Sequence, residues 1–248
     1  ATWRRLTLIF TLTKATRAHL ADQGIREDRI HAVHDPCDTD IYRPVERARC
    51  RVRFGYSDDE FVMVHHGILH PNKAIDRILR GLQPLAEKHK NLRLLLVGSG
   101  PQLKELMALA RRLDIEHAVQ FSGWLPTLSD VNQALNAADV GLVMREGTQS
   151  DHFHVTSALT HSMAAGLPVL AARLGGISEI VEDGVHGFLF DPFSMDEFQG
   201  RLETIMSDPT LLARMGRQAR ERAEEVFDID HITRQLLTPI QRLAENAS

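Results

Sequence analysis

Two hydrophobic patterns alternate along this 248-residue chain, and this alternation constrains its fold more than any other feature. Short apolar runs typical of buried strands are separated by longer stretches in which apolar residues recur at helical spacing. Because parallel strands need a crossover segment between them, the alternation predicts βαβ units and a parallel sheet with helices on both faces. The expected strands are residues 6–12, 30–33, 61–66, 92–97, 119–121, 140–143, 169–171 and 188–190.

The expected helices fill the intervals between these strands. Thr13 is a suitable N-cap for the first of them, and the chain is almost entirely helical from Ser194 onward. The six strands after residue 60 therefore predict a doubly wound, Rossmann-like α/β sheet. Besides the C-terminal region, the expected helices are residues 13–23, 75–85, 102–113, 128–137, 155–165 and 177–182.

Residues 34–44, HDPCDTDIYRP, interrupt this rhythm with two prolines and three aspartates, and residues 45–55 are charged and irregular. We place a domain junction here. The predicted organisation is a remnant of an N-terminal domain plus junction over residues 1–44, a Rossmann-like domain over 45–228, and a C-terminal helix over 229–248 that packs back on the N-terminal part. The sequence begins abruptly with a strand and without Met, so we expect it to be part of a longer protein.

Composition excludes several classes of protein. The formal net charge of -4 gives no electrostatic case for nucleic acid binding. Cys37 and Cys50 are too few for a disulfide scaffold and wrongly spaced for a zinc finger, so we expect free thiols. No run of about 18 uncharged apolar residues and no signal peptide is present, and we therefore expect a cytoplasmic protein.

Ligands of open parallel sheets bind at the carboxyl ends of the strands. Three loops at these ends are candidates for ligand binding. In GILHPNK, residues 67–73, Gly67 permits close approach of a ligand, and Lys73 stands where it can meet a phosphate near a helix N-terminus. A solvated lysine at a helix start is the alternative for Lys73. In GSGP, residues 98–101, a tight turn between strand and helix explains the pattern equally well.

The third loop, residues 146–160, is unusually polar for a segment that leaves a buried strand. Thr156 and Ser157 lie at the start of the following helix, where hydroxyls and free amides form either an anion site or a simple cap. Asp151, His152 and His154 offer hydrogen bonds to sugar hydroxyls. The same three residues could alternatively bind a metal together with His161, which lies on roughly the same helix face as His154, but no coherent zinc spacing surrounds them, and we expect no metal. Farther on, we expect Glu179 to be structural, near the start of a short helix.

Several of these segments together resemble the C-terminal half of the retaining glycosyltransferases of family 4, whose GT-B fold has two facing Rossmann-like domains. The resemblance covers nearly the whole chain. It implies a hexosyltransferase-like enzyme of polysaccharide or glycoconjugate biosynthesis that binds a UDP- or GDP-sugar and transfers the sugar with retention of configuration. The segments are VHDPCDTDIYRP, GILHPNK, VGSGP, VQFSGWL, AADVGLV, SMAAGLPVLA and GGISEIVEDGVHGFLFDP.

The resemblance also implies where the donor binds, with no metal and no other cofactor. We expect the diphosphate at the first polar loop and the helix that begins near residue 155, the sugar or ribose along the third loop, and the base near the ends of the second and third strands of the main sheet. The diphosphate residues are Gly67, Lys73, Val155, Thr156 and Ser157; the sugar or ribose residues are Glu146, Asp151, His152, His154 and His161; the base residues are Gly98, Ser99, Phe121, Ser122 and Gly123.

Three positions depart from the family pattern. Ile68 stands where an arginine is usual, and Phe153 and His161 stand where glutamates are usual, so no catalytic residue is assigned. The acceptor site is expected on a missing N-terminal domain or partner chain. Peripheral association with a membrane through that missing part is a further possibility. The alternatives are a non-catalytic module that docks on a glycosyltransferase subunit and a nucleotide-sugar epimerase of the same architecture.

Overall fold

The computed structural model describes residues 6–245, and within them the main sheet has six parallel strands. The strands lie in the order β5-β4-β3-β6-β7-β8, so the chain reverses direction across the sheet between β3 and β6. This is the strand order of a doubly wound Rossmann fold, and the predicted fold class is confirmed. The strands are β3 (Phe61–His66), β4 (Leu92–Val97), β5 (Val119–Gly123), β6 (Val140–Val143), β7 (Val169–Ala172) and β8 (Gly187–Phe190).

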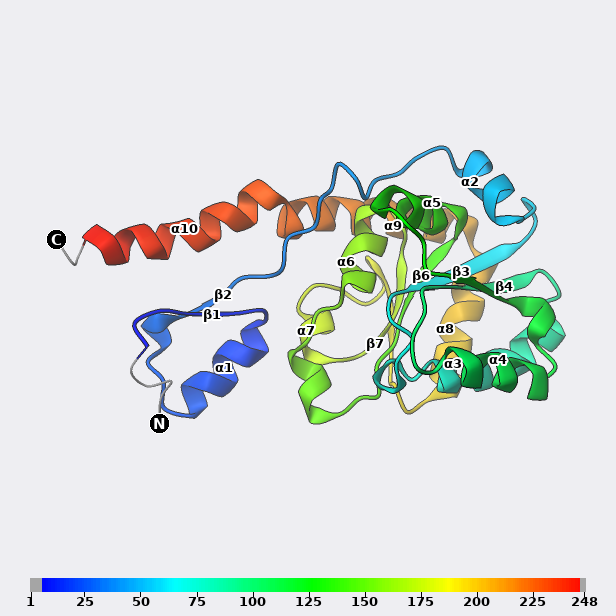
Figure 1. Ribbon diagram of the computed structural model, residues 1–248, viewed down its shortest axis with the longest axis horizontal. Helices are drawn as coiled ribbons and strands as arrows, with labels where there is room; N and C mark the ends of the chain where they lie inside the picture. The colour runs from blue at the N-terminus through cyan, green and yellow to red at the C-terminus, as the bar shows by residue number, and fades with distance from the viewer. Residues whose placement is uncertain (1–5, 246–248) are drawn as a thin grey trace.

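Helices cover both faces of this sheet, with α5, α6 and α9 on one side and α3, α4 and α8 on the other (Figure 1). In α3 the apolar residues at helical spacing are buried, while Arg80 and Glu87 on its other face are exposed. The predicted helices are present, with shifts of a few residues at their ends. They are α3 (Ile75–Lys88), α4 (Leu103–Arg112), α5 (Leu128–Ala137), α6 (Ser157–Ala164), α7 (Gly175–Ser178), α8 (Met195–Ser207) and α9 (Pro209–Phe227).

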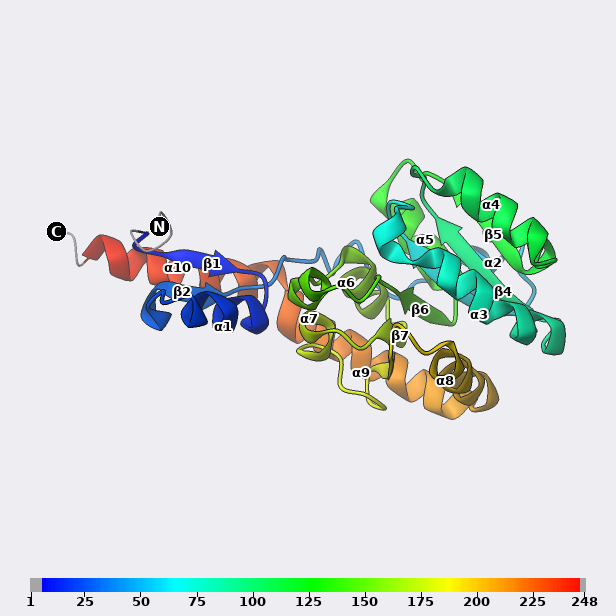
Figure 2. The ribbon, with the colours of Figure 1, turned by 90° about the horizontal axis from the view of Figure 1, so that it is seen from below.

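A smaller N-terminal unit stands apart from this body (Figure 2). Its strands β1 (Ile9–Thr11) and β2 (Ile30–Ala32) pair in parallel, and α1 (Lys14–Asp22) connects them. The C-terminal helix α10 (Ile229–Glu245) lies beside this unit, since residues of both line one cavity. Residues 1–5 and 246–248, at the ends of the predicted domains, lie outside the described residues, and the limits at residues 44 and 228 stay predictions.

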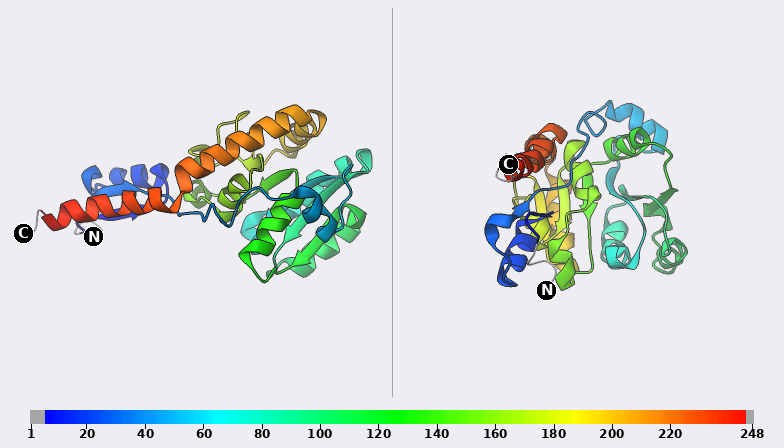
Figure 3. Two further views of the ribbon diagram at one scale, coloured as in Figure 1. Left: turned by 90° about the horizontal axis from the view of Figure 1, so that it is seen from above. Right: turned by 60° about the vertical axis from the view of Figure 1, so that its left-hand side comes forward.

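Two groups of contacts join the N-terminal unit to the body. The Glu179 carboxylate accepts hydrogen bonds from the backbone amides of Lys14 (2.8 Å) and Ala15 (2.7 Å), so it caps α1. Glu179 is therefore structural as expected, but it follows α7 and serves a helix of the other unit. On the opposite side, the Cys37 amide donates to the carbonyl of Phe227 (2.8 Å), where the two connections between the units run together (Figure 3).

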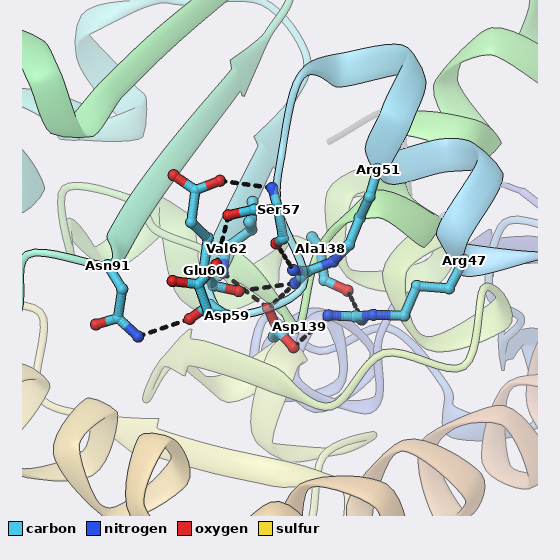
Figure 4. A network of polar contacts seen from close by, with 9 residues as sticks. All are labelled: Arg47, Arg51, Ser57, Asp59, Glu60, Val62, Asn91, Ala138 and Asp139. Carbon is cyan, nitrogen blue, oxygen red and sulfur yellow. Dashed lines mark hydrogen bonds and ion pairs between the residues drawn. The ribbon is translucent and has the colours of Figure 1, made fainter.

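Residues 45–55 form helix α2 (Arg47–Phe54), and the prediction of an irregular segment is wrong. Arg51 in this helix is only 1% exposed. Its guanidinium donates to the carbonyls of Ser57 and Glu60 and pairs with Asp139 at 2.7 Å (Figure 4). Arg51, one of the charged residues that made the segment look irregular, is thus the residue that anchors it. Its partners lie elsewhere in the chain, so the local sequence does not reveal them.

We expect Arg51→Ala to lower the free energy of unfolding by about 3–5 kcal/mol, because it leaves the Asp139 carboxylate and two carbonyls without their buried partner. Arg47→Ala is the matched control: Arg47 also pairs with Asp139 (2.5 Å), but its side chain is 43% exposed, so its removal should cost about 1 kcal/mol or less. Urea denaturation of both variants measures the difference. Equal losses would contradict this account of α2.

His65 in β3 predicts a specific loss of stability in acid. It is 2% exposed, its Nδ1 lies 3.0 Å from the carbonyl oxygen of Leu142, and burial lowers its pKa to about 4. The unfolded chain, with a histidine pKa near 6.5, takes up the proton first, so the stabilisation present above that pH is lost as the pH falls towards 4.

Between pH 7.5 and pH 5, His65 should therefore account for about 2 kcal/mol of the lost unfolding free energy. Urea denaturation at the two pH values should show a correspondingly smaller drop in His65→Leu. His117→Leu removes an exposed histidine and should keep the drop of the unmodified chain. The account fails if the two variants lose stability in parallel.

Candidate functional site

Two adjoining cavities open at the point where the strand order reverses, beside the carboxyl end of β3. The lysine cavity, of about 470 Å³, lies between the loop after β3 and the start of α6. The aromatic cavity, of about 460 Å³, extends towards the loop after β5. The lysine cavity is lined by His66, Gly67, Ile68, His70, Asn72, Lys73, Thr156, Ser157 and Ala158, and the aromatic cavity by Tyr42, His66, Gly67, Val97, Gly98, Trp124, Leu125, Pro126, Thr127, Leu128, Val131, Ser157 and His161.

Close packing of α6 on β6 brings the start of α6 to this edge of the sheet. A Cβ atom at Gly141 in β6 would lie 2.5 Å from the side chain of Ser162, so only glycine permits this approach. At the other wall, a Cβ at Gly98 would lie 2.0 Å from the carbonyl oxygen of Gly67. Glycine at these two positions therefore sets the width of the cavities. In GSGP, Gly98 therefore forms the tight turn after β4 and also lines the aromatic cavity.

Lys73 carries the positive charge of the lysine cavity, since it is the one lysine or arginine among the described residues that line it. It ends a short 3-10 helix (Pro71–Lys73) that precedes α3, and it is half-buried. Burial lowers the pKa of Lys73, the guanidinium of Arg145 lowers it further, and the carboxylate of Asp151 opposes both. A fixed cation in a partly desolvated cavity favours an anionic ligand.

Buried polar atoms without a hydrogen-bond partner gather around the two cavities. Among the described residues, these atoms include Thr156 Oγ1, His66 Nε2, His161 Nδ1 and Asn72 Oδ1. Thr156 is the N-cap of α6, yet its side chain makes no capping bond. Because an unpaired buried polar atom costs about 1–3 kcal/mol, such a cluster indicates a place where a ligand supplies the partners.

Three rings stack where the cavities meet. Tyr42 from the junction lies on His161 of α6, with ring centroids 3.7 Å apart, and His161 lies parallel to His66 of β3 at 5.1 Å. Burial lowers the pKa of His161 to about 4 and is also the main reason that the pKa of His66 is low. Both rings are therefore neutral near pH 7 and can offer hydrogen bonds without adding charge.

The walls of the aromatic cavity are mainly apolar. Trp124 is 71% exposed at its mouth, and Pro126 and Val131 line it farther along. A slot with apolar walls and a few polar atoms at one end suits a flat ring system joined to a polar group.

The structure brings part of the predicted site together. The predicted residues that line the cavities are Gly67, Lys73, Thr156, Ser157, His161 and Gly98. Val155 and Phe121 pack against the core instead, because their apolar side chains are partly buried there. The other predicted base residues serve local backbone geometry: the carbonyls of Ser99 and Gly123 accept from the amides of Leu69 and Gly98, and Ser122 donates to the carbonyl of Gly123.

Asp151 is buried and lines neither cavity. It is 2% exposed, and its carboxylate accepts from Arg145 Nε (2.5 Å) and from the amides of Gly147 (3.1 Å) and Thr148 (3.0 Å). These partners use the carboxylate within its own loop, so the expected contact between Asp151 and the sugar is corrected to a structural role.

The remaining residues predicted for the sugar line neither cavity. His152 accepts a hydrogen bond from the amide of Gly175 (3.1 Å), and His154 is exposed. The amide of Glu146 donates to the carbonyl of Asn72 (3.1 Å), which ties the loop after β6 to the loop after β3. Phe153, at a position where the family pattern has glutamate, contacts the ring of His19 in α1 (5.3 Å) and so serves the contact between the units.

Sequence reasoning missed several residues of the site. Tyr42 and His66 complete the ring stack, and Trp124 with its apolar neighbours forms the outer wall. The doublet of histidines that ends β3 and the apolar segment after Gly123 are signals that could have indicated them, since both place unusual side chains at the carboxyl end of a strand.

Other expectations concern cysteines, metals and membranes. Cys37 and Cys50 are both buried and free, which confirms the prediction of free thiols. Within residues 6–245, no group of three or more His, Cys, Asp or Glu side chains is arranged to hold a metal ion. No helix in the same range combines the length and the apolar character needed to cross a bilayer.

Comparison with known proteins gives relatives by sequence and similar solved structures. The chain is 32% identical over 237 residues to the D-inositol 3-phosphate glycosyltransferase of Gordonia bronchialis, which covers 90% of this chain and 49% of that protein. The crystal structure of Anabaena HepE in complex with UDP-glucose is similar with a TM-score of 0.84 and 25% identity, over 96% of this chain and 65% of that one.

A third similar structure is the C-terminal domain of a glycosyl transferase group 1 family protein from Francisella tularensis. Its TM-score is 0.67 at 16% identity, over 78% of this chain and 99% of that one. At this identity the similarity supports a shared fold and nothing more. The chain spans about half the length of the curated relatives it matches. Residues 47–222 match the family described as glycosyl transferases group 1. The length of this match shows that the chain belongs to the glycosyl transferases group 1 family and that its main body is a Rossmann-like unit of the GT-B fold.

Proposed function

We propose that this chain binds the nucleotide-sugar donor of a glycosyltransferase and that the whole protein transfers the sugar with retention of configuration. The observation that carries the proposal is the pair of adjoining cavities, in which a fixed cation and unpartnered polar atoms lie next to an apolar slot. The similarity to a protein solved with UDP-glucose supports a UDP-sugar, and a GDP-sugar has the same diphosphate.

The diphosphate fits the lysine cavity. Lys73 supplies a positive charge there, and the start of α6 supplies the partial positive charge of a helix N-terminus. The hydroxyl of Thr156, which has no partner within the described residues, can donate to a phosphate oxygen. This arrangement is positive without a metal, so the proposal includes metal-independent binding.

The nucleoside fits the aromatic cavity. The base would lie between apolar walls near Trp124 and Val131, and the ribose would lie where the rings of His66 and His161 meet the lysine cavity. Neutral imidazole nitrogens can accept or donate hydrogen bonds to ribose hydroxyls without repelling the nearby cation.

The same groups would serve the reaction. When the bond between the sugar and the diphosphate breaks, negative charge grows on the leaving phosphate. Lys73 and the amides of α6 are fixed in place beforehand, so they stabilise this developing charge more than they stabilise the bound donor. The acceptor site and the remaining reaction partners belong, in this proposal, to the other half of the protein.

The proposal predicts that UDP, GDP or a UDP-sugar raises the melting temperature of the chain, since a ligand at a hundredfold its Kd stabilises the folded state by about 2.7 kcal/mol. Lys73→Ala should remove most of this shift and weaken UDP binding in calorimetry. EDTA should leave it unchanged. Lys104→Ala, an exposed lysine of α4, is the matched control and should bind like the unmodified chain. If no nucleotide shifts the melting temperature, the proposal is wrong and a non-catalytic docking module becomes the better account.

A further inference from the structure

We propose that Arg145 supplies a second positive charge to the diphosphate of the donor and that Asp151 holds it in place. This inference rests on the proposed function. Nothing in the sequence pattern marked Arg145, which follows the buried end of β6 and is itself buried.

The need for a second cation follows from the charges at the lysine cavity. A nucleoside diphosphate sugar carries a negative charge on each of its two phosphates. Lys73 is the one lysine or arginine among the described lining residues, and Ile68, which is 57% exposed, offers no charge. The stacked ring of His66 is neutral near pH 7 because its pKa is low. One lysine would therefore face two phosphates unless another cation lies close by.

Arg145 is placed to be that cation. β6 pairs in parallel with β3, so the loops that follow the two strands leave the same edge of the sheet. The amide of Glu146 donates to the carbonyl of Asn72 at 3.1 Å, which joins the residue after Arg145 to the residue before Lys73. The two cations therefore start from adjoining segments of backbone, and the guanidinium of Arg145 contributes to the lowered pKa of Lys73.

The side chain of Arg145 is held before any ligand arrives. It is 10% exposed and donates through Nε to Asp151 at 2.5 Å. The other oxygen of Asp151 is itself fixed by the amides of Gly147 and Thr148 and by the hydroxyl of Thr148 (2.8 Å). The hydrogen bonds found among the described residues use Nε of Arg145, which leaves its two terminal nitrogens to form the fork that matches phosphate oxygens.

The charges of this group also point to a ligand. Lys73, Arg145 and Asp151 together carry a net positive charge in a partly buried place. A purely structural pair of Arg145 with Asp151 would be neutral. It would give no reason to place Lys73 half-buried beside it, because burial and the charge of Arg145 both disfavour the charged form of the lysine. A bound diphosphate neutralises the excess.

The test measures binding of UDP and of uridine by isothermal titration calorimetry at low salt. Arg145→Ala should weaken UDP about ten- to a hundredfold, the range for losing a charge-assisted hydrogen bond, while uridine changes less than about threefold. Arg145→Gln keeps a donor for Asp151 without the charge, should show the same selective loss, and replaces the alanine variant if that one does not fold by circular dichroism. Ile68→Arg in the Arg145→Ala background puts a cation back at the cavity and should restore UDP affinity.

The matched control is Arg77→Ala. Arg77 also anchors the loop after β6, through the carbonyl of Glu146 (2.9 Å), but its guanidinium lies over the ring of Phe193 (5.2 Å). Unlike Arg145, it is not among the charges that act on Lys73, so UDP affinity should stay within about threefold. Equal losses for UDP and uridine in Arg145→Gln would overturn the inference in favour of a structural role, and so would unchanged UDP affinity. In both cases UDP binding by the unmodified chain and its loss in Lys73→Ala leave the proposed function standing, whereas no nucleotide binding at all refutes that function.

Discussion

The parallel pairing of β3 with β6 is the interaction on which the rest of this molecule depends. Met63 pairs with Val140 and Val64 with Gly141, so two strands far apart in the sequence become neighbours at the centre of the sheet. Their following loops must then diverge to opposite faces, which opens a crevice at the carboxyl edge. Gly141 adds the second condition, because the absence of a side chain there lets α6 settle on β6 and bring its first turn to the crevice.

The network around Asp139 protects this pairing from the other end of the strands. Asp139 directly precedes β6, and it accepts a hydrogen bond from the amide of Val62 in β3 at 2.8 Å as well as from Arg51 and Arg47. A carboxylate at the amino edge thus fixes the relative position of β3 and β6, while function gathers at the carboxyl edge. The separation lets the loops of the site vary without disturbing the pairing of the strands.

The fold could be predicted from the sequence because strands and helices differ in their hydrophobic period, which is a local property. The site could be predicted only where a residue's role follows from its place at the end of a strand or the start of a helix, as for Gly67, Lys73 and Thr156. The ring stack, the burial of Arg51 and the pairing of Asp151 with Arg145 depend on partners that only the folded chain brings together. Asp151 was misread for that reason: a carboxylate in a polar loop looks like a ligand until its arginine is seen.

Glu179 links the start of α1 to the relative position of the two units. Its carboxylate satisfies two amides at the start of α1, and the hinge-like contact of Cys37 with Phe227 lies on the other side of the molecule. Rotation about that contact would pull α1 away from Glu179 and leave the amides of Lys14 and Ala15 without their acceptor, while the Thr13 hydroxyl would still accept from the amide of Thr16 (3.0 Å). The ordering of α1 is thereby coupled to the angle between the units. Bringing the two units together and capping the first two amides of α1 would then be one event.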